Sequence, residues 1–226
     1  MSRPTITIGS PHRRDFTPEY VQSLADTLTT DIGVNFVFKP TAGTSIHEQR
    51  NAVARTMVGD YLLCVDTDMM WQPEDIRALL ELDKDIAGGL YLDPTRPPYA
   101  CLVFDDYGYI TDIPKEPFEC NSIGAGFLFI KRRVIDALLV PEFVEKSGLP
   151  FDLVLVDKEH LMDGLSVWVP EDLSFCMRAR YAGFSVWCHP GVRIGHIKAT
   201  AHYPETQTGH PQNEVGTTEN YTLATS

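Results

Sequence analysis

The sequence has no long apolar run and few cysteines. No stretch of its 226 residues approaches the ~20 consecutive apolar residues that a membrane helix needs, and no leader typical of a secreted protein opens the chain. The five cysteines include no C-x-x-C pair, which argues against a zinc site or a disulfide framework. We therefore expect a cytoplasmic protein without a membrane span, whose thiols are buried and reduced.

Positive charge is also scarce. The chain has 19 Lys and Arg residues against 31 Asp and Glu residues, a formal net charge of −12. Such a charge repels polyanions, so a phosphate group must be bound by local cations or by a metal ion. Binding to DNA would require a local basic patch, for which Lys131-Arg132-Arg133 is the candidate.

Strand-like and helix-like segments alternate along most of the chain. Hydrophobic residues make up 43% and charged residues 22%, close to the average for a globular domain. We expect strands near residues 5–8, 34–38, 61–66, 85–91, 121–130 and 184–188, and helices near residues 17–28, 46–57, 72–80, 131–139 and 170–183. This order predicts an α/β, Rossmann-like fold with a mixed, mostly parallel sheet flanked by helices.

Three segments depart from this alternation. Residues 100–110 predict a small β-hairpin around Asp105-Asp106-Tyr107-Gly108. Residues 141–163 show few periodic signals and predict a loop. Residues 199–226 are polar and lack a core-forming pattern. We therefore expect one domain over residues 1–198 and a flexible polar tail over residues 199–226.

Two short patterns mark expected element boundaries. Gly9-Ser10-Pro11 follows the first strand and predicts a turn. Ser45-Ile46-His47-Glu48 has the S-x-x-E pattern of a capping box, which predicts that a helix begins at about Ile46.

A buried strand is predicted to end in two carboxylates. The apolar run Tyr61-Leu62-Leu63-Cys64-Val65 is followed by Asp66-Thr67-Asp68, and the ends of such strands are where open α/β sheets bind ligands. Two aspartates at i and i+2 can share a divalent cation, or one can hold the metal while the other binds a sugar hydroxyl. The alternative is that they form a turn and cap the next helix.

Three further acidic or imidazole groups lie far from Asp66 in the sequence. Glu171-Asp172 begins a predicted helix, and His196 follows the last predicted strand. A carboxylate here can accept a proton from an attacking hydroxyl. Acids in the first turn of a helix also favour its dipole, so capping is the alternative. A structural histidine is likewise the alternative for His196.

The order of several short motifs resembles that of GT-A glycosyltransferases, in particular family-2-like enzymes of short phage and bacterial type. The resemblance extends over roughly residues 5–198. It rests on Arg50-Asn51, Gly59-Asp60-Tyr61, Asp66-Thr67-Asp68, Gly88-Gly89-Leu90-Tyr91, Gly124-Ala125-Gly126-Phe127, Pro170-Glu171-Asp172, Ala182-Gly183-Phe184 and Gly195-His196-Ile197.

The resemblance implies a metal site and a catalytic pair. Asp66, Asp68 and His196 match the residues that hold Mn²⁺ or Mg²⁺, with Asp66 also near the ribose or donor sugar. Asp172 matches the general base of inverting members, and Glu171 is expected to contact the acceptor or support the loop.

The resemblance also implies a site for a nucleotide-diphosphate sugar. The residues that we expect there are Gly9, Ser10, Arg50, Asn51, Asp66, Thr67, Gly88, Gly89 and Gly126. For Arg50, a solvated helix side chain is the alternative, and for Gly88-Gly89 an ordinary turn is. Trp71 is a candidate stacking face for a sugar or base. The family's uracil-binding aspartate is missing, because Lys39-Pro40-Thr41 stands after the second strand, and this leaves the nucleotide open.

These observations predict a metal-dependent enzyme that transfers a hexosyl or pentosyl group, with inversion, to a hydroxyl on a glycan, a protein or a modified DNA base. One alternative is a sugar-phosphate nucleotidyltransferase, which needs a glycine-rich basic loop where this chain has Gly9-Ser10-Pro11-His12-Arg13. Another is a nucleotide-sugar-binding protein without catalytic activity.

Overall fold

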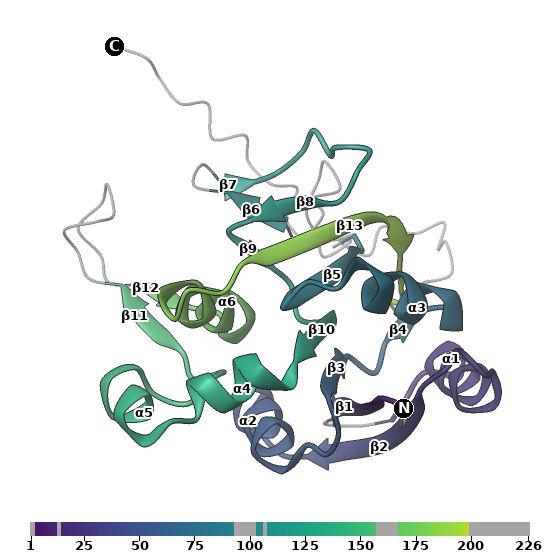
Figure 1. Cartoon of the computed structure of the whole chain (residues 1–226), viewed down its shortest axis with the longest axis horizontal. Coiled ribbons are helices and arrows are strands. Elements are labelled where there is room, and N and C mark those ends of the chain that lie inside the picture. The colour runs from purple at the N-terminus through teal and green to yellow at the C-terminus, as the bar shows by residue number, and fades with distance from the viewer. Residues whose placement is uncertain (1–2, 13–14, 93–102, 106–107, 157–166, 199–226) are drawn as a thin grey trace, which may run out of the picture.

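The apolar run ahead of Asp66 forms β3 (Tyr61–Val65), an inner strand of a seven-stranded sheet (Figure 1). The computed structural model describes residues 3–12, 15–92, 103–105, 108–156 and 167–198. The strand order is β2-β1-β3-β10-β5-β13-β8. Five of these strands share one direction, and β10 and β8 run the opposite way. The predicted mixed, mostly parallel sheet is confirmed.

The first part of the chain alternates strands and helices as expected. Its elements are β1 (Thr5–His12), α1 (Pro18–Thr29), β2 (Asn35–Ala42), α2 (Ile46–Thr56), β3, β4 (Met69–Met70), α3 (Pro73–Leu82) and β5 (Ile86–Leu90). Thr17 caps α1, because its side chain accepts a hydrogen bond of 3.2 Å from the backbone N–H of Tyr20.

The second part adds antiparallel strands and shorter helices. Its elements are β6 (Val103–Asp105), β7 (Gly108–Tyr109), β8 (Phe118–Cys120), β9 (Ser122–Ile123), β10 (Phe127–Lys131), α4 (Arg132–Leu138), α5 (Pro141–Ser147), β11 (Val154–Val156), β12 (Val167–Val169), α6 (Glu171–Tyr181), β13 (Val186–Arg193) and β14 (Gly195–His196). The hairpin β6-β7 confirms the predicted small β-hairpin region. The prediction of a loop over residues 141–163 was wrong in its described part, since α5 and β11 form there.

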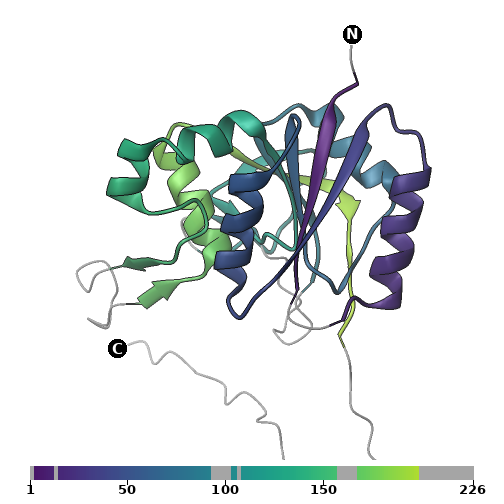
Figure 2. The same ribbon diagram turned by 90° about the horizontal axis from the view of Figure 1, so that it is seen from below.

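Helices cover both faces of the sheet because successive side chains of a strand point to opposite faces. In β3, Leu62 and Cys64 pack toward α2, α4 and α6, whereas Leu63 and Val65 pack toward α1 and α3. Figure 2 shows α1 and α2 on opposite sides of the strands. The result is a three-layer arrangement with two apolar cores.

Two boundary predictions need correction. Gly9-Ser10-Pro11 does not form a turn, because β1 continues to His12 and pairs in parallel with β2 along its whole length. Ser45 is the N-cap residue of α2, but the capping box is absent, since its hydroxyl lies 2.5 Å from Nδ1 of His47 instead of contacting the helix N–H groups. The polar side chain two residues away competes for the hydroxyl.

The longest described helix, α1, has 12 residues. Among the helices that the structure describes, none is long and apolar enough to cross a bilayer. Four of the cysteines, Cys64, Cys120, Cys176 and Cys188, are buried as expected. Cys101 and the predicted tail over residues 199–226 lie outside the described residues.

Candidate active site

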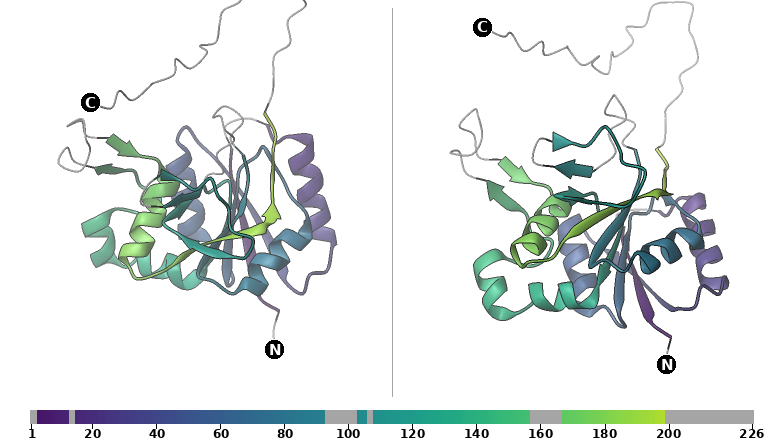
Figure 3. Two further views of the ribbon diagram at one scale, coloured as in Figure 1. Left: turned by 90° about the horizontal axis from the view of Figure 1, so that it is seen from above. Right: turned by 45° about the horizontal axis from the view of Figure 1, so that its top comes forward.

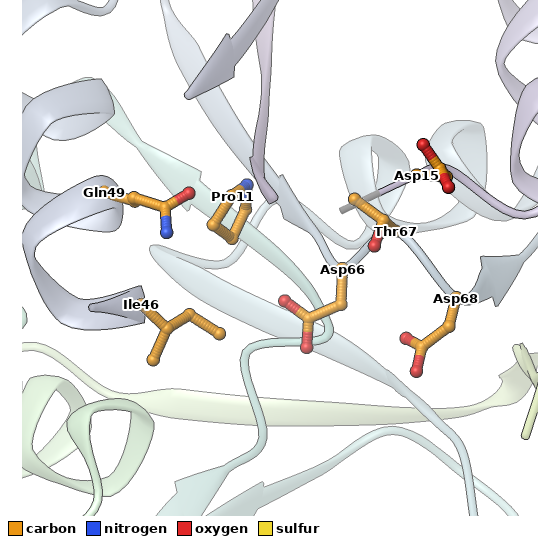
Figure 4. Close-up of a pocket in the computed structure, with 7 residues that line it drawn as sticks. All are labelled: Pro11, Asp15, Ile46, Gln49, Asp66, Thr67 and Asp68. Atoms are coloured by element: carbon orange, nitrogen blue, oxygen red, sulfur yellow. The ribbon is translucent and has the colours of Figure 1, made fainter. Parts of the chain in front are cut away.

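A cavity of about 640 Å³ opens where β1 and β3 end (Figure 4). Figure 3 shows this edge of the sheet opposite the N-terminal end of the chain. The carboxylates of Asp66 and Asp68 both face the cavity. Its lining consists of Pro11, Asp15, Ile46, Gln49, Asp66, Thr67 and Asp68.

Backbone contacts hold the segment Asp66-Thr67-Asp68 in place. The N–H of Asp66 donates to the carbonyl of Gly126 at 3.0 Å, and the carbonyl of Thr67 accepts a hydrogen bond from the N–H of Thr17 at 3.1 Å. The loop before β10 and the start of α1 therefore fix both acidic side chains relative to the sheet.

Arg50 lies at the centre of the buried part of the site. Its side chain is only 2% exposed, and its guanidinium donates to Asp66 Oδ1 at 2.7 Å and to Glu171 Oε1. It also donates to the carbonyl of Ala125 at 3.3 Å. Asp66 and Glu171, far apart in the sequence, thus share one cation. We call Arg50, Asp66, Glu171 and Asp172 the Arg50 network.

Burial sets the acidity of two members of the Arg50 network. It raises the pKa of Asp66 above the usual value, although the Arg50 guanidinium acts in the opposite direction. Burial also raises the pKa of Asp172, and the nearby carboxylate of Glu171 acts in the same direction. A carboxylate with a raised pKa is a stronger base, so Asp172 is suited to accept a proton.

A second group of side chains surrounds Asp68 on the solvent side of the cavity. Asp68 Oδ2 lies 3.4 Å from His196 Nε2 and 2.8 Å from Lys198 Nζ. We call Asp68, His196 and Lys198 the Asp68 cluster. Burial alone would raise the pKa of Asp68, but the hydrogen bonds from His196 and Lys198 outweigh it and lower the pKa to about 2.

Short strands bring His196 to Asp68. β14 pairs with β4, which follows Asp68 directly, and the N–H of Ile197 donates to the carbonyl of Asp68 at 2.8 Å. Nδ1 of His196 donates to the carbonyl of Leu92 at 2.8 Å, and Tyr91 packs its ring against the imidazole at 5.6 Å between centroids. The imidazole therefore has a fixed orientation with Nε2 toward Asp68.

The Asp68 cluster fits an open metal site and not a closed one. In the described part of the chain, no three His, Cys, Asp or Glu side chains form a complete set of ligands. Because Nδ1 of His196 donates to a carbonyl, Nε2 is the nitrogen that would coordinate a cation beside Asp68 Oδ2, after losing the proton that it directs at that carboxylate. One or two protein ligands are typical where Mg²⁺ is also held by substrate phosphates and water.

Gly126 is required by close packing at the base of the site. A Cβ atom there would lie 2.4 Å from Cε of Met69 and 2.9 Å from the Tyr91 hydroxyl. The N–H of Gly126 donates to that hydroxyl at 3.0 Å. Gly126 therefore supports Asp66 through the backbone.

Several residues expected at the nucleotide site have structural partners instead. The hydroxyl of Ser10 hydrogen bonds to Tyr20, and a Cβ at Gly9 would lie 2.5 Å from Val53. Asn51 donates to Asp152 at 2.8 Å and accepts a hydrogen bond from the N–H of Phe151. None of Gly9, Ser10 and Asn51 is among the residues that line the cavity.

Gly88-Gly89 and Trp71 lie in the core. A Cβ at Gly88 would lie 2.7 Å from Ile123, and one at Gly89 would lie 2.4 Å from Val192, so packing within the sheet layers explains both glycines. Trp71 is 1% exposed and donates from its indole to Thr27 at 2.9 Å, so it offers no stacking face.

The predicted basic cluster is neutralised. Lys131 pairs with Asp83 at 2.6 Å, and Arg133 pairs with Asp85. Arg132 donates to the backbone carbonyl of Met57 at 3.0 Å. These residues tie α4 to neighbouring loops and do not form a free positive surface.

Sequence patterns missed Pro11, Asp15, Ile46, Gln49 and Lys198. Ile46 and Gln49 are three positions apart on α2, a spacing that puts both on one face of the helix. Gln49 accepts a hydrogen bond from the N–H of His12 at 2.7 Å, which joins α2 to the end of β1. The helical spacing was the available signal, whereas nothing local distinguishes Asp15 or Lys198 from a surface residue.

A second cavity, of about 530 Å³, opens where β5 and β13 end. Its walls are mostly apolar, and they include Tyr91 and Leu92, which also contact His196. Lys115 and Arg193 are the charged residues in its lining. His196 therefore contacts lining residues of both cavities, Asp68 of the first and Tyr91 and Leu92 of the second.

Comparisons with known proteins agree with this architecture. Residues 11–97 match the family model described as glycosyl transferase family 2. No curated protein sequence matches the chain. The crystal structure of A197 from STIV is similar with a TM-score of 0.57 at 17% identity, covering 92% of this chain and all of that one.

A second similar structure is that of GalNAc-T7 with UDP, GalNAc and Mn²⁺. Its TM-score is 0.54 at 13% identity, and the match covers 87% of this chain and 44% of that one. The fold is therefore of GT-A type, as the sequence resemblance implied, and residues 11–97 are similar to the family-2 model.

Proposed function

We propose that this family-2-like GT-A chain is a metal-dependent glycosyltransferase that moves a sugar from a nucleotide-diphosphate sugar to a hydroxyl acceptor, with inversion. The observation that carries the proposal is that Arg50 joins Asp66 to Glu171, the neighbour of Asp172, while His196 contacts Asp68 two residues beyond Asp66. We assign this function to one domain over residues 1–198.

The donor would bind in the cavity beside the Asp68 cluster. Asp68 and His196 would hold Mn²⁺ or Mg²⁺, which supplies positive charge for the diphosphate leaving group. Asp66 is held by Arg50 with its free carboxylate edge toward the cavity, where it can accept a hydrogen bond from a ribose or sugar hydroxyl. Asp15, Gln49 and Thr67 complete the polar lining.

Asp172 is the group that we assign as the general base. Its carboxylate would accept the proton of the acceptor hydroxyl as that oxygen attacks the anomeric carbon from the face opposite the leaving group. Glu171 is bound to Arg50, so we assign it the role of orienting the guanidinium and the start of α6. The raised pKa of Asp172 favours this division of roles.

The second cavity supports a site for the acceptor. It shares Tyr91 and Leu92 with the surroundings of His196, so an acceptor bound there would lie beside the donor. A glycan or protein hydroxyl fits the apolar walls better than a DNA base does, because the Lys131-Arg132-Arg133 cluster is already paired.

A panel of nucleotide sugars, incubated with Mn²⁺, Mg²⁺ or EDTA and followed by mass spectrometry, tests the proposal. We expect metal-dependent donor hydrolysis or transfer, which Asp68→Ala abolishes. Release of pyrophosphate from a nucleoside triphosphate and a sugar phosphate would instead identify a nucleotidyltransferase, and binding without turnover would identify a binding protein.

Asp172→Asn tests the assignment of the base. We expect transfer to fall about 10²–10⁴-fold while the donor still binds, because only proton transfer is lost. The matched control is Glu74→Gln, which removes an exposed acid from the first turn of α3. Equal activity of Asp172→Asn and Glu74→Gln would contradict the assignment.

A further inference from the structure

Lys198 was not expected at the site, yet it contacts the carboxylate oxygen that faces His196. Its ammonium lies 2.8 Å from Oδ2 of Asp68, the same atom that lies 3.4 Å from Nε2 of His196. The position between these two metal-binding side chains is where a divalent cation would have to approach. Lys198 therefore occupies one side of that approach.

The two nitrogen groups around Asp68 differ in how firmly they are held. His196 is fixed by the Leu92 carbonyl, the Tyr91 ring and the pairing of β14 with β4. Lys198 lies beyond β14, and its side chain is 42% exposed. Among the described residues, Asp68 is its one hydrogen-bond and ion-pair partner. A long, half-exposed side chain can leave its partner at little cost.

We propose that Lys198 is a built-in counter-ion that competes with the divalent cation for Asp68, and that the donor diphosphate relieves this competition by pairing with the displaced ammonium. This inference rests on the proposed function. It predicts that metal and nucleotide bind cooperatively, each raising the affinity for the other by the same factor.

Electrostatics support a cooperative order of binding. An ammonium a few ångströms from a divalent cation repels it, so the cation alone binds weakly while Lys198 is present. A diphosphate brings negative charge that can contact both cations together. Without a bound donor, Asp68 faces a cavity lined by other acids, in a chain with a net charge of −12. The Lys198 ammonium offsets the negative charge of Asp68 in that state.

The test is Mn²⁺ binding, measured by electron paramagnetic resonance of free Mn²⁺, with and without UDP, GDP or ADP. We expect Lys198→Met to tighten Mn²⁺ binding without nucleotide about two- to fivefold, the size of one exposed ion pair. A nucleoside diphosphate should strengthen Mn²⁺ binding in the unmodified protein. In Lys198→Met, this strengthening should be smaller by the same factor.

The matched control is Lys131→Met, which removes a lysine from an ion pair of similar length, with Asp83 at 2.6 Å, away from the cavity. Asp68→Asn should lose the Mn²⁺ site. Unchanged Mn²⁺ affinity in Lys198→Met, an equal gain in Lys131→Met, or no Mn²⁺ binding to any of these proteins would overturn the inference.

The outcome separates this inference from the proposed function. Tighter Mn²⁺ binding by Lys198→Met in a protein that transfers no sugar would support the role of Lys198 and refute glycosyl transfer. Sugar transfer that proceeds fully in EDTA, without Mn²⁺ binding, would refute the role of Lys198 and leave a metal-independent transferase.

Discussion

The two sides of the proposed donor cavity hold their acids in different ways. In the Arg50 network, a cation that is 2% exposed joins Asp66 to Glu171. In the Asp68 cluster, the cation is a lysine that is 42% exposed. Removing one partner from a buried ion pair leaves an uncompensated charge, whereas an exposed pair exchanges partners easily. We therefore expect the Arg50 network to keep a fixed geometry and the Asp68 cluster to exchange ions.

Arg50→Met should produce the largest change in stability. It would leave Asp66 and Glu171 without their shared cation, and we expect the free energy of unfolding to fall by about 3–5 kcal/mol. Thermal and denaturant unfolding measure the loss. Arg3→Met, which breaks the exposed pair with Asp31, is the control and should cost less than about 1 kcal/mol. Similar losses in both variants would remove the distinction between buried and exposed pairs.

Asn51→Ala should lower the free energy of unfolding by an intermediate amount. It tests whether the fixed geometry of the Arg50 network extends to Asn51. Asn51 is 4% exposed and joins α2 to Phe151 and Asp152. Its removal leaves the Phe151 N–H unsatisfied, so we expect a loss of about 1–3 kcal/mol. Nucleotide affinity, measured by calorimetry, should not change. A large loss of nucleotide affinity with normal stability would instead support the sequence-based prediction that Asn51 contacts the nucleotide.

The smallest effects on folding stability should come from the ionisation of Asp68 and Asp172, and the two effects should have opposite signs. The folded-state pKa of Asp68 is lowered to about 2, so its ionised form stabilises the fold above about pH 4, and this is lost as the pH falls toward 2. The pKa of Asp172 is raised, so its ionised form opposes folding at neutral pH, and this cost disappears as the pH falls to about 4.

We therefore expect Asp172→Asn to melt above, and Asp68→Asn below, the unmodified protein at pH 7. Melting curves from pH 7 to 3 should show the first difference closing by about pH 4 and the second shrinking only below that value. Asp136→Asn, on the exposed side of α4, is the control. Shifts of the same sign in both variants would contradict the pKa assignments.

Local patterns predicted most elements of the sheet but not all of its pairings. The runs that became β3, α2, β5 and α6 have clear periodicity, caps or terminal glycines, so their positions followed from the chain itself. β10 was expected as a strand, but its antiparallel place between β3 and β5 depends on pairings such as Phe127 with Val65 and Leu128 with Gly88, which join residues far apart in the sequence. Two-residue strands such as β4 and β14 have no periodicity to detect.

The site was predictable in its residue types and less so in its contacts. Asp66, Asp68 and His196 stand at strand ends, which sequence patterns reveal. The exclusion of Asn51 and Ser10 from the cavity depends on partners elsewhere, Asp152 and Tyr20. Such long-range hydrogen bonds leave no trace in a window of neighbouring residues.

The position of β10 bears on how the chain acquires its structure. β3 and β5 each need β10 as a neighbour, and β10 ends at Lys131. A fragment limited to residues 11–97 would expose unpaired strand edges, which favour aggregation. During synthesis the cavity beside Asp66 and Asp68 cannot be completed before this strand emerges, so this edge is among the last parts of the sheet to form.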